Sequence, residues 1–184
     1  MPANLQKNII LTGFSFTGKS SVAKLAASRL GWKPVDLDRE IIKKTGKTIP
    51  EIFADEGEEA FRVRESCALS KICKEEKQVI ATGGGVVLSE KNRRLLKRSG
   101  LVIWLEARPE TIYHRLLEES GYSSSSEVRP LLAGKDPLAK ITTLKQSRQA
   151  CYEDAHITIH TDSLDVKAVT ERVTEAWNTW NGYK

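Results

Sequence analysis

The sequence has few cysteines, no long apolar run and no clustered charge, and each of these lacks excludes a class of protein. The three cysteines, Cys67, Cys73 and Cys151, form no C-x-x-C pair, so neither a disulfide framework nor a zinc site is expected. The apolar run at residues 9–11 is far shorter than a signal or membrane-spanning segment. We therefore expect a cytoplasmic protein with no membrane partner.

Charge is mixed along the chain rather than gathered into a stripe. There are 29 Lys and Arg residues against 24 Asp and Glu residues, which gives a net charge of +5. Nucleic-acid surfaces need clustered basic residues, so no nucleic-acid partner is expected, and an enzyme with anionic substrates explains the excess as well. A chain of 184 residues with 40% hydrophobic content and no internal repeat predicts a single domain over residues 1–184.

Residues 8–30 form the most informative stretch, because an apolar strand, a turn and a helix pattern follow one another there. Gly13, Gly18, Lys19 and Ser20 fit the phosphate-binding pattern G-x-x-x-x-G-K-[ST]. In this pattern backbone N–H groups converge on phosphate oxygens, the lysine reaches the β- and γ-phosphates, and the hydroxyl ligates Mg²⁺. An ordinary glycine turn is the alternative, but the flanking strand and helix favour the phosphate loop. The expected nucleotide contacts are Gly13, Phe14, Ser15, Phe16, Thr17, Gly18, Lys19, Ser20 and Ser21.

Apolar strand segments alternate with helical periodicity through the rest of the chain. Because a helical crossover between strands implies parallel pairing, we predict an α/β protein, a three-layer sandwich with a five-stranded parallel sheet. The strands are expected at residues 8–12, 34–38, 78–82, 101–105 and 156–161. The principal helices are expected at residues 19–30, 58–76, 90–98, 109–119 and 137–152, with a last one from 166.

Two acidic residues and one arginine are candidate site residues near the strand ends. Asp36 and Asp38 lie two apart in P-V-D-L-D, which predicts that they share one side of a strand near its carboxyl end, where ligands bind in α/β sheets. A solvated strand end or a helix cap is the alternative. Arg62 and Glu65 share a helix face and can pair, although a surface ion pair is the commoner fate of such an arginine.

Two loops complete the candidate site. Gly83, Gly84 and Gly85 follow a buried strand and permit a ligand to approach bare backbone, with a flexible turn as the alternative. Residues 120–135 contain a serine-rich run followed by Arg129 in an apolar stretch, which is typical of a lid that closes on substrate and delivers a charge to phosphates. A plain surface loop is the alternative there.

These motifs together resemble the shikimate kinase family over residues 8–152. The resemblance implies the P-loop fold of the nucleoside monophosphate kinase type, with a mobile lid over about residues 120–135. Phe16 stands where many small kinases carry another glycine, and the serine-rich lid is longer than the family's. The motifs that carry the resemblance are G-x-x-x-x-G-K-S, D-L-D at 36–38, F-R-x-x-E at 61–65, T-G-G-G at 82–85, V-R-P-L-L-A-G at 128–134 and R-x-x-x-Y at 148–152.

The resemblance also implies roles for residues in the nucleotide and metal sites. Lys19 and Ser20 would serve ATP and Mg²⁺, and Asp36 would support the hydrated magnesium. Arg129 would contact the transferring phosphate. Arg115 is the nearest candidate for the arginine that packs on adenine.

For the substrate, the resemblance implies shikimate, phosphorylated on its 3-hydroxyl by a monomeric enzyme of aromatic amino acid biosynthesis. Asp38 would bind the substrate hydroxyls and accept the proton from the one that is phosphorylated. Arg62 and Arg148 would clamp the carboxylate. The backbone of Gly83, Gly84 and Gly85 would add contacts.

Two other functions stay open at this point. A gluconate or nucleotide kinase of the same architecture would not need Arg62 and Arg148 together. A nucleotide-binding module without catalysis, basic enough to bind nucleic acid, would bind ATP regardless of shikimate.

Overall fold

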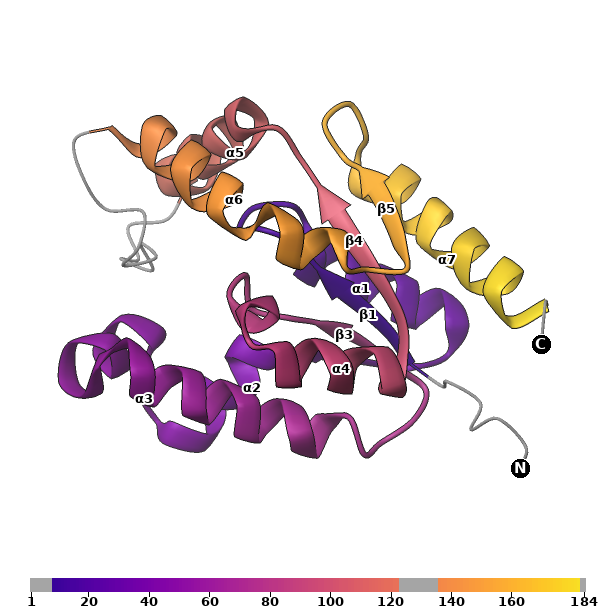
Figure 1. Cartoon of the computed structure of the whole chain (residues 1–184). Coiled ribbons are helices and arrows are strands. Elements are labelled where there is room, and N and C mark those ends of the chain that lie inside the picture. Colours follow the sequence, from indigo (N-terminus) through magenta and orange to yellow (C-terminus); the bar gives the residue numbers. More distant parts are fainter. Residues whose placement is uncertain (1–7, 123–135, 183–184) are drawn as a thin grey trace.

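Five strands lie side by side in one parallel sheet within residues 8–122 and 136–182, the part of the chain that this computed structural model describes (Figure 1). The strand order is β2-β3-β1-β4-β5 and every pair is parallel. The predicted fold is therefore confirmed. The strands are β1 (Asn8–Thr12), β2 (Lys33–Asp36), β3 (Gln78–Ala81), β4 (Gly100–Glu106) and β5 (Ile157–His160).

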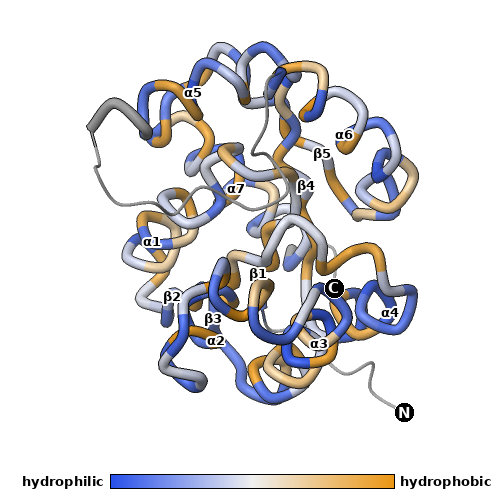
Figure 2. Tube along the Cα trace, turned by 90° about the vertical axis from the view of Figure 1, so that its left-hand side faces the viewer, coloured by the Kyte–Doolittle hydropathy of each residue, from blue (hydrophilic) through white to orange (hydrophobic). Residues whose placement is uncertain are grey.

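Helices cover both faces of the sheet, because alternate strand residues point to opposite sides. On β1, Ile10 packs in one apolar cluster and its neighbours Ile9 and Leu11 pack in the other. Helices α1 (Lys19–Leu30) and α7 (Val166–Gly182) supply the cluster that contains Ile9 and Leu11. Figure 2 shows that the helices around the sheet carry both hydrophilic and hydrophobic residues, as expected of amphipathic helices. The opposite face is covered by α2 (Leu37–Thr45), α3 (Ile49–Ile72), α4 (Glu90–Ser99), α5 (Pro109–Tyr122) and α6 (Pro137–Glu153).

Most predicted element bounds lie within about one residue of those in the structure, but the helix expected over residues 58–76 is part of α3, which runs from Ile49 to Ile72. Helix α1 ends at Leu30 because Gly31 takes a left-handed conformation, with φ of 66°, and closes the last turn. Ser89 caps α4 by accepting a hydrogen bond from the Asn92 amide, and Asp136 caps α6 in the same way. Gly57, with φ of 82°, kinks α3.

The end of the second strand was predicted wrongly. Strand β2 stops at Asp36, and Asp38 lies in the first turn of α2, so the two aspartates do not share one side of a strand. The reason is that the Asp36 carboxylate accepts a hydrogen bond from the Arg39 amide at 3.2 Å and thereby caps α2. The alternative interpretation of a helix cap is the correct one for Asp36.

The phosphate loop follows the central strand, between the carboxyl ends of β3 and β4. The chain leaves β1, crosses to the edge strand β2, and returns to pair β3 beside β1, so loops from both halves of the sheet open there. Such a crevice outside the carboxyl ends of the strands is where α/β proteins bind ligands. Among the described residues, no helix combines the length and the apolar character that crossing a bilayer requires. Most of the expected lid, including Arg129, falls outside the described residues, while α5 extends three residues beyond its predicted end at 119.

Candidate active site

The loop between β1 and α1 has the shape that a phosphate cradle needs. Gly18 precedes α1 with φ of 89°, a left-handed conformation that glycine adopts without a steric penalty. Lys19 is 7% exposed, and its ammonium donates a hydrogen bond to the Phe14 carbonyl oxygen, which also accepts from the Thr17 hydroxyl at 3.0 Å. The lysine therefore lies over the loop, directly at the N-terminus of α1.

Phe16 is the one strained position in this loop. Its φ of 61° lies in the left-handed region, which costs about 1–2 kcal/mol for a residue with a side chain. The half-buried ring packs against the apolar cluster on the α3 face, and its carbonyl accepts a hydrogen bond from Arg115 at 3.3 Å. Arg115 also donates to the Thr161 hydroxyl at 3.1 Å and the Thr161 carbonyl at 2.7 Å. Arg115 thus ties the phosphate loop to the end of β5.

Glycine and alanine variants of Phe16 are expected to reverse their usual order of stability. Both variants lose the packing of the ring, but only Phe16→Gly also relieves the left-handed strain. The free energy of unfolding of Phe16→Gly should therefore be about 1 kcal/mol larger than that of Phe16→Ala. Phe53, inside α3, is the matched control, because there glycine should be less stable than alanine by about 1 kcal/mol. Urea unfolding measures both pairs. A glycine variant less stable than the alanine variant at position 16 would contradict the strain.

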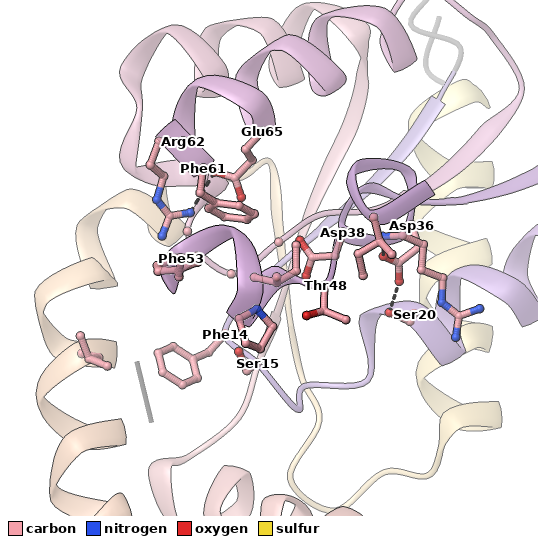
Figure 3. Close-up of a pocket in the computed structure, with 18 of the residues that line it drawn as sticks. Phe14, Ser15, Ser20, Asp36, Asp38, Thr48, Phe53, Phe61, Arg62 and Glu65 are labelled. Atoms are coloured by element: carbon pink, nitrogen blue, oxygen red, sulfur yellow. Dashed lines mark hydrogen bonds and ion pairs between the residues drawn. The ribbon is translucent and has the colours of Figure 1, made fainter. Parts of the chain in front are cut away.

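The two predicted magnesium ligands meet beside this loop. The Ser20 hydroxyl donates to the Asp36 carboxylate at 2.5 Å, which joins the start of α1 to the end of β2 (Figure 3). A hydroxyl and a carboxylate are hard oxygen donors, and Mg²⁺ in phosphate-transferring proteins uses one or two such groups together with the substrate's phosphates. The donor set therefore fits Mg²⁺.

The three-glycine loop after β3 lies against side chains from two other elements, α2 and α3. A methyl group on Gly83 would lie 2.8 Å from Asp38 Oδ1 and 2.7 Å from Glu65 Oε1, and one on Gly85 would collide with the Arg62 guanidinium. A side chain at either position would force these carboxylate and guanidinium groups to move, because real Cβ contacts are longer. Bare backbone is thus what allows α2 and α3 to present these groups beside the loop.

Arg62 is held in place by two carboxylates of its own helix. Its Nη1 donates to Glu65 at 2.9 Å, its Nη2 donates to Glu58 at 3.0 Å, and its guanidinium lies 5.2 Å from the centroid of the Phe61 ring. Burial alone would lower the pKa of Arg62, but the charges of Glu65 and Glu58 raise it on balance. Arg62 is therefore a fixed cation with its side chain still 24% exposed.

Arg148 approaches from the opposite side, on α6. It is 8% exposed, and its guanidinium lies 5.7 Å from the centroid of the Phe14 ring in the phosphate loop. One turn further on, the Tyr152 hydroxyl donates to the Gly84 carbonyl oxygen at 2.6 Å. Burial raises the pKa of Tyr152 to about 12, although Arg148 opposes the shift, so this hydroxyl stays a donor at neutral pH.

One cleft of about 380 Å³ collects these groups. Figure 3 shows Arg62 and Glu65 on one side, Asp36 with Ser20 on the other, and Asp38 between them. Of the predicted residues, Gly13, Phe16, Thr17, Gly18, Lys19 and Arg115 do not line this cleft. The predicted residues that do line it are Phe14, Ser15, Ser20, Ser21, Asp36, Asp38, Arg62, Gly83, Gly84, Gly85 and Arg148.

Sequence reasoning missed the apolar part of the cleft. Phe53 and Phe61 line it, with ring centroids 4.9 Å apart, and Thr48, Ile49 and Pro50 lie beside them. Phenylalanines on the apolar face of a helix are typical of packing residues, so their spacing does not mark them as part of a cleft. One signal was available, because Thr48 and the residue three further on, Glu51, form a capping box that fixes where α3 begins.

Glu65 is the least satisfied polar group of the cleft. It is 1% exposed, and its Oε1 has no hydrogen-bond partner among the described residues. Burial raises the pKa of this carboxyl, the neighbouring Asp38 raises it further, and Arg62 and Arg148 oppose the shift. Glu65 therefore has one oxygen on Arg62 and a second that can accept a hydrogen bond from a ligand hydroxyl or a water molecule.

The raised pKa predicts a pH-dependent effect of Glu65→Gln on stability. In the unfolded chain this carboxyl titrates near 4.5, and in the folded protein it titrates at higher pH. Its contribution to stability is thus fully present below pH 4.5 and is lost as the pH rises through the folded value. As the pH rises from 4.5 through the folded value, the wild type should lose stability relative to Glu65→Gln, as measured by urea unfolding.

Glu51 provides the control of opposite sign for this titration. Hydrogen bonds from the Thr48 amide and hydroxyl lower the pKa of Glu51, so its contribution is present above pH 4.5 and is lost as the pH falls. The wild type should therefore gain stability relative to Glu51→Gln as the pH rises. If the stability difference between wild type and variant changed with pH in the same direction for Glu65→Gln and Glu51→Gln, the buried, unsatisfied state of Glu65 would be ruled out.

Comparison with known proteins agrees with this geometry. The family model described as "Shikimate kinase" matches residues 16–178. The shikimate kinase of Symbiobacterium thermophilum is 43% identical over 91% of this chain and 94% of its own, and that of Moorella thermoacetica is 40% identical over 94% and 95%. A solved shikimate kinase from Acinetobacter baumannii in complex with shikimate has a TM-score of 0.87 and 34% identity, covering 95% of this chain and 94% of its own. The match of family, length and fold confirms the resemblance carried by the motifs, and the chain belongs to the shikimate kinase family.

Proposed function

We propose that this protein transfers the γ-phosphoryl group of ATP to the 3-hydroxyl of shikimate, giving shikimate 3-phosphate and ADP in the pathway to chorismate and the aromatic amino acids. The observation that carries the proposal is the convergence of Arg62, Arg148 and Asp38 in a single cleft that also reaches the phosphate loop. Two cations and a carboxylate in one cleft suit a small acid that bears hydroxyl groups. The naming of the relatives as shikimate kinases supports the same assignment.

The substrate carboxylate binds between Arg62 and Arg148. Both guanidinium groups are planar donors that can form paired hydrogen bonds to a carboxylate, and both are held by neighbours before the substrate arrives. The ring of shikimate then lies toward Phe53 and Phe61, and backbone groups of the three-glycine loop contact its hydroxyls.

In the reaction, the 3-hydroxyl oxygen of shikimate forms a bond to the γ-phosphorus while the bond from that phosphorus to the β–γ bridging oxygen breaks. The hydroxyl proton passes to the Asp38 carboxylate, and the electron pair of the broken bond stays on ADP. Lys19 stabilises the negative charge on the transferring group, and the loop amides hold the β-phosphate. Alignment and neutralised charge are the main requirements of phosphoryl transfer.

ATP is the co-substrate that the family implies, and Mg²⁺ would be held by Ser20 with Asp36 beside it. When bound, the ion neutralises charge on the phosphates. We propose nucleotide contacts for Arg115 and for Arg129, which lies outside the described residues. We further propose a single domain that works as a monomer in the cytoplasm.

A coupled assay of ADP formation tests the proposal. With ATP and Mg²⁺ present, shikimate should start ADP release, and gluconate and nucleoside monophosphates should not. A Lys19→Met variant purified in parallel shows whether any activity comes from a contaminating kinase. Turnover of gluconate or a nucleoside monophosphate without turnover of shikimate would reject the assignment. ATP binding that shikimate does not alter, without any turnover, would favour the non-catalytic module.

A further inference from the structure

Helix α6 carries a second, largely buried cation besides Arg148. Ile141, Lys145, Arg148 and Tyr152 follow the spacing that places residues on one face of a helix. Ile141 and Tyr152 are at most 1% exposed, Arg148 is buried, and the Lys145 side chain is 13% exposed. A lysine on such a face is unusual, because desolvating an ammonium is costly unless it is paired.

The partner of Lys145 is Glu106, the last residue of β4. Lys145 Nζ lies 2.7 Å from Glu106 Oε1, and the side chain of Glu106 is only 10% exposed. The other carboxylate oxygen, Oε2, lies 2.9 Å from Nδ1 of His160, whose side chain is 72% exposed at the end of β5. Asp162 also lies close to Glu106 and His160, but Thr111 and Arg108 donate hydrogen bonds to it. Glu106 thus joins α6 to the carboxyl edge of the sheet.

Two attachments on this face fix the rotation of α6, and Arg148 lies between them. On one side Lys145 binds Glu106. On the other, Tyr152 binds the Gly84 carbonyl oxygen and stacks on Trp104 of β4, with ring centroids 5.8 Å apart and an interplanar angle of 12°. Glu106 and Trp104 are two residues apart on the same strand, so both attachments hold α6 to β4.

Small rotations of this helix matter for the cleft. A side-chain group lies about 6 Å from the helix axis, so a rotation of about 10° moves it by about 1 Å. A displacement of about 1 Å at a binding or reacting group can cost up to about a hundredfold in rate. The Arg148 guanidinium has little freedom to compensate, because it is buried against Phe14.

We propose that Lys145 and Glu106 form a positioning pair that sets the rotation of α6 and so aims Arg148 at the substrate carboxylate. The inference rests on the proposed function for its substrate and on the geometry of α6 for its mechanism. Neither residue lines the cleft, so the pair acts through Arg148 rather than on the substrate.

Kinetics of three variants test the pair. Lys145→Met keeps the length of the side chain and removes its charge, and it should raise KM for shikimate about tenfold while KM for ATP stays within about twofold. Lys145→Arg restores the cation and should return KM for shikimate to within about threefold of the wild type. Lys140→Met, the same change at an exposed position of the same helix, should leave both KM values unchanged. Glu106→Gln should also raise KM for shikimate, and it provides the test if Lys145→Met fails to fold.

A double variant separates positioning from general stability. If the two residues act as a pair, Glu106→Gln combined with Lys145→Met should raise KM for shikimate no more than Lys145→Met alone. A lower Tm for Lys145→Met with an unchanged KM for shikimate would mean that the pair is only structural. Additive effects in the double variant would also overturn the proposal.

The position of Arg148 can be followed without any substrate. The side-chain Nε–H signal of a buried arginine, assigned by its loss in Arg148→Lys, can be compared between the wild type and Lys145→Met by nuclear magnetic resonance. The signal should shift or broaden in Lys145→Met and stay in place in Lys140→Met. An unchanged signal overturns the positioning role. A wild type that neither binds nor phosphorylates shikimate overturns the proposed function alone.

Discussion

Replacing Lys19 by methionine is expected to lower kcat by about 10²–10³-fold with little loss of stability. Lys19 is 7% exposed and its ammonium lies at the N-terminus of α1 over the phosphate loop, so in the proposed reaction it would act on the transferring phosphoryl group in a site that excludes much of the water. Charge stabilisation is stronger in such surroundings than in water. Methionine has a side chain of similar length and keeps the apolar stem contacts, so the fold should survive.

Steady-state rates and urea unfolding of the same preparation measure the two halves of this prediction. The free energy of unfolding should stay within about 1 kcal/mol of the wild type, as for a substitution that leaves no cavity. Lys167→Met is the matched control, because Lys167 is exposed on α7 and α7 packs on the face of the sheet opposite α3. If the Lys19→Met variant retained a kcat within tenfold of the wild type, the role of Lys19 in the reaction would be contradicted.

Replacing Arg148 by lysine is expected to raise KM for shikimate by about 10–100-fold, although the charge is conserved. A lysine ammonium is a point charge and cannot form the two parallel hydrogen bonds of a guanidinium to a carboxylate. A hydrogen bond to a charged group contributes about 1.5–3 kcal/mol, which corresponds to roughly that range of affinity. Stacking over the Phe14 ring is lost as well, because the guanidinium is the planar group there.

The same experiment on Arg62 distinguishes the candidate substrates. For a hydroxy-acid held by both guanidinium groups, Arg62→Lys should also raise KM for shikimate, with KM for ATP unchanged in both variants. A kinase that recognises its acceptor in another way would tolerate the loss of Arg62. Arg29→Lys, on an exposed ion pair with Glu171, is the control and should change neither constant. An unchanged KM for shikimate in Arg148→Lys would contradict the proposal that Arg62 and Arg148 bind the substrate carboxylate together.

Local signals predicted the part of the fold around the phosphate loop most completely. At residues 8–31 an apolar run, a phosphate-loop motif and a glycine stop agree, and the bounds of β1 and α1 came out as predicted. At Asp36 two local signals compete. The spacing of Asp36 and Asp38, two residues apart, favours a longer strand, whereas an aspartate three residues before a backbone amide at the start of a helix favours a helix cap. In the structure Asp36 forms the cap, so Asp38 lies in helix α2 and not in the strand.

Contacts between distant residues could not be predicted from spacing. Glu106 and Lys145 are both charged, and residue type alone predicts that charged residues are solvent-exposed. Their burial depends on how α6 lies on β4, which only the three-dimensional structure defines. The nearness of Arg62 to Gly85 and of Arg148 to Phe14 has the same origin. Of these residues, Arg148 could be predicted from the sequence only through the family resemblance.

A crystal structure with shikimate and ADP tests the central claim most directly, because it locates the acid group of the substrate. The carboxylate should lie within hydrogen-bond distance, about 3 Å, of the guanidinium groups of both Arg62 and Arg148, with the 3-hydroxyl beside Asp38 and facing the phosphate loop. A carboxylate bound away from both arginines, or a 3-hydroxyl directed away from Asp38, would contradict it.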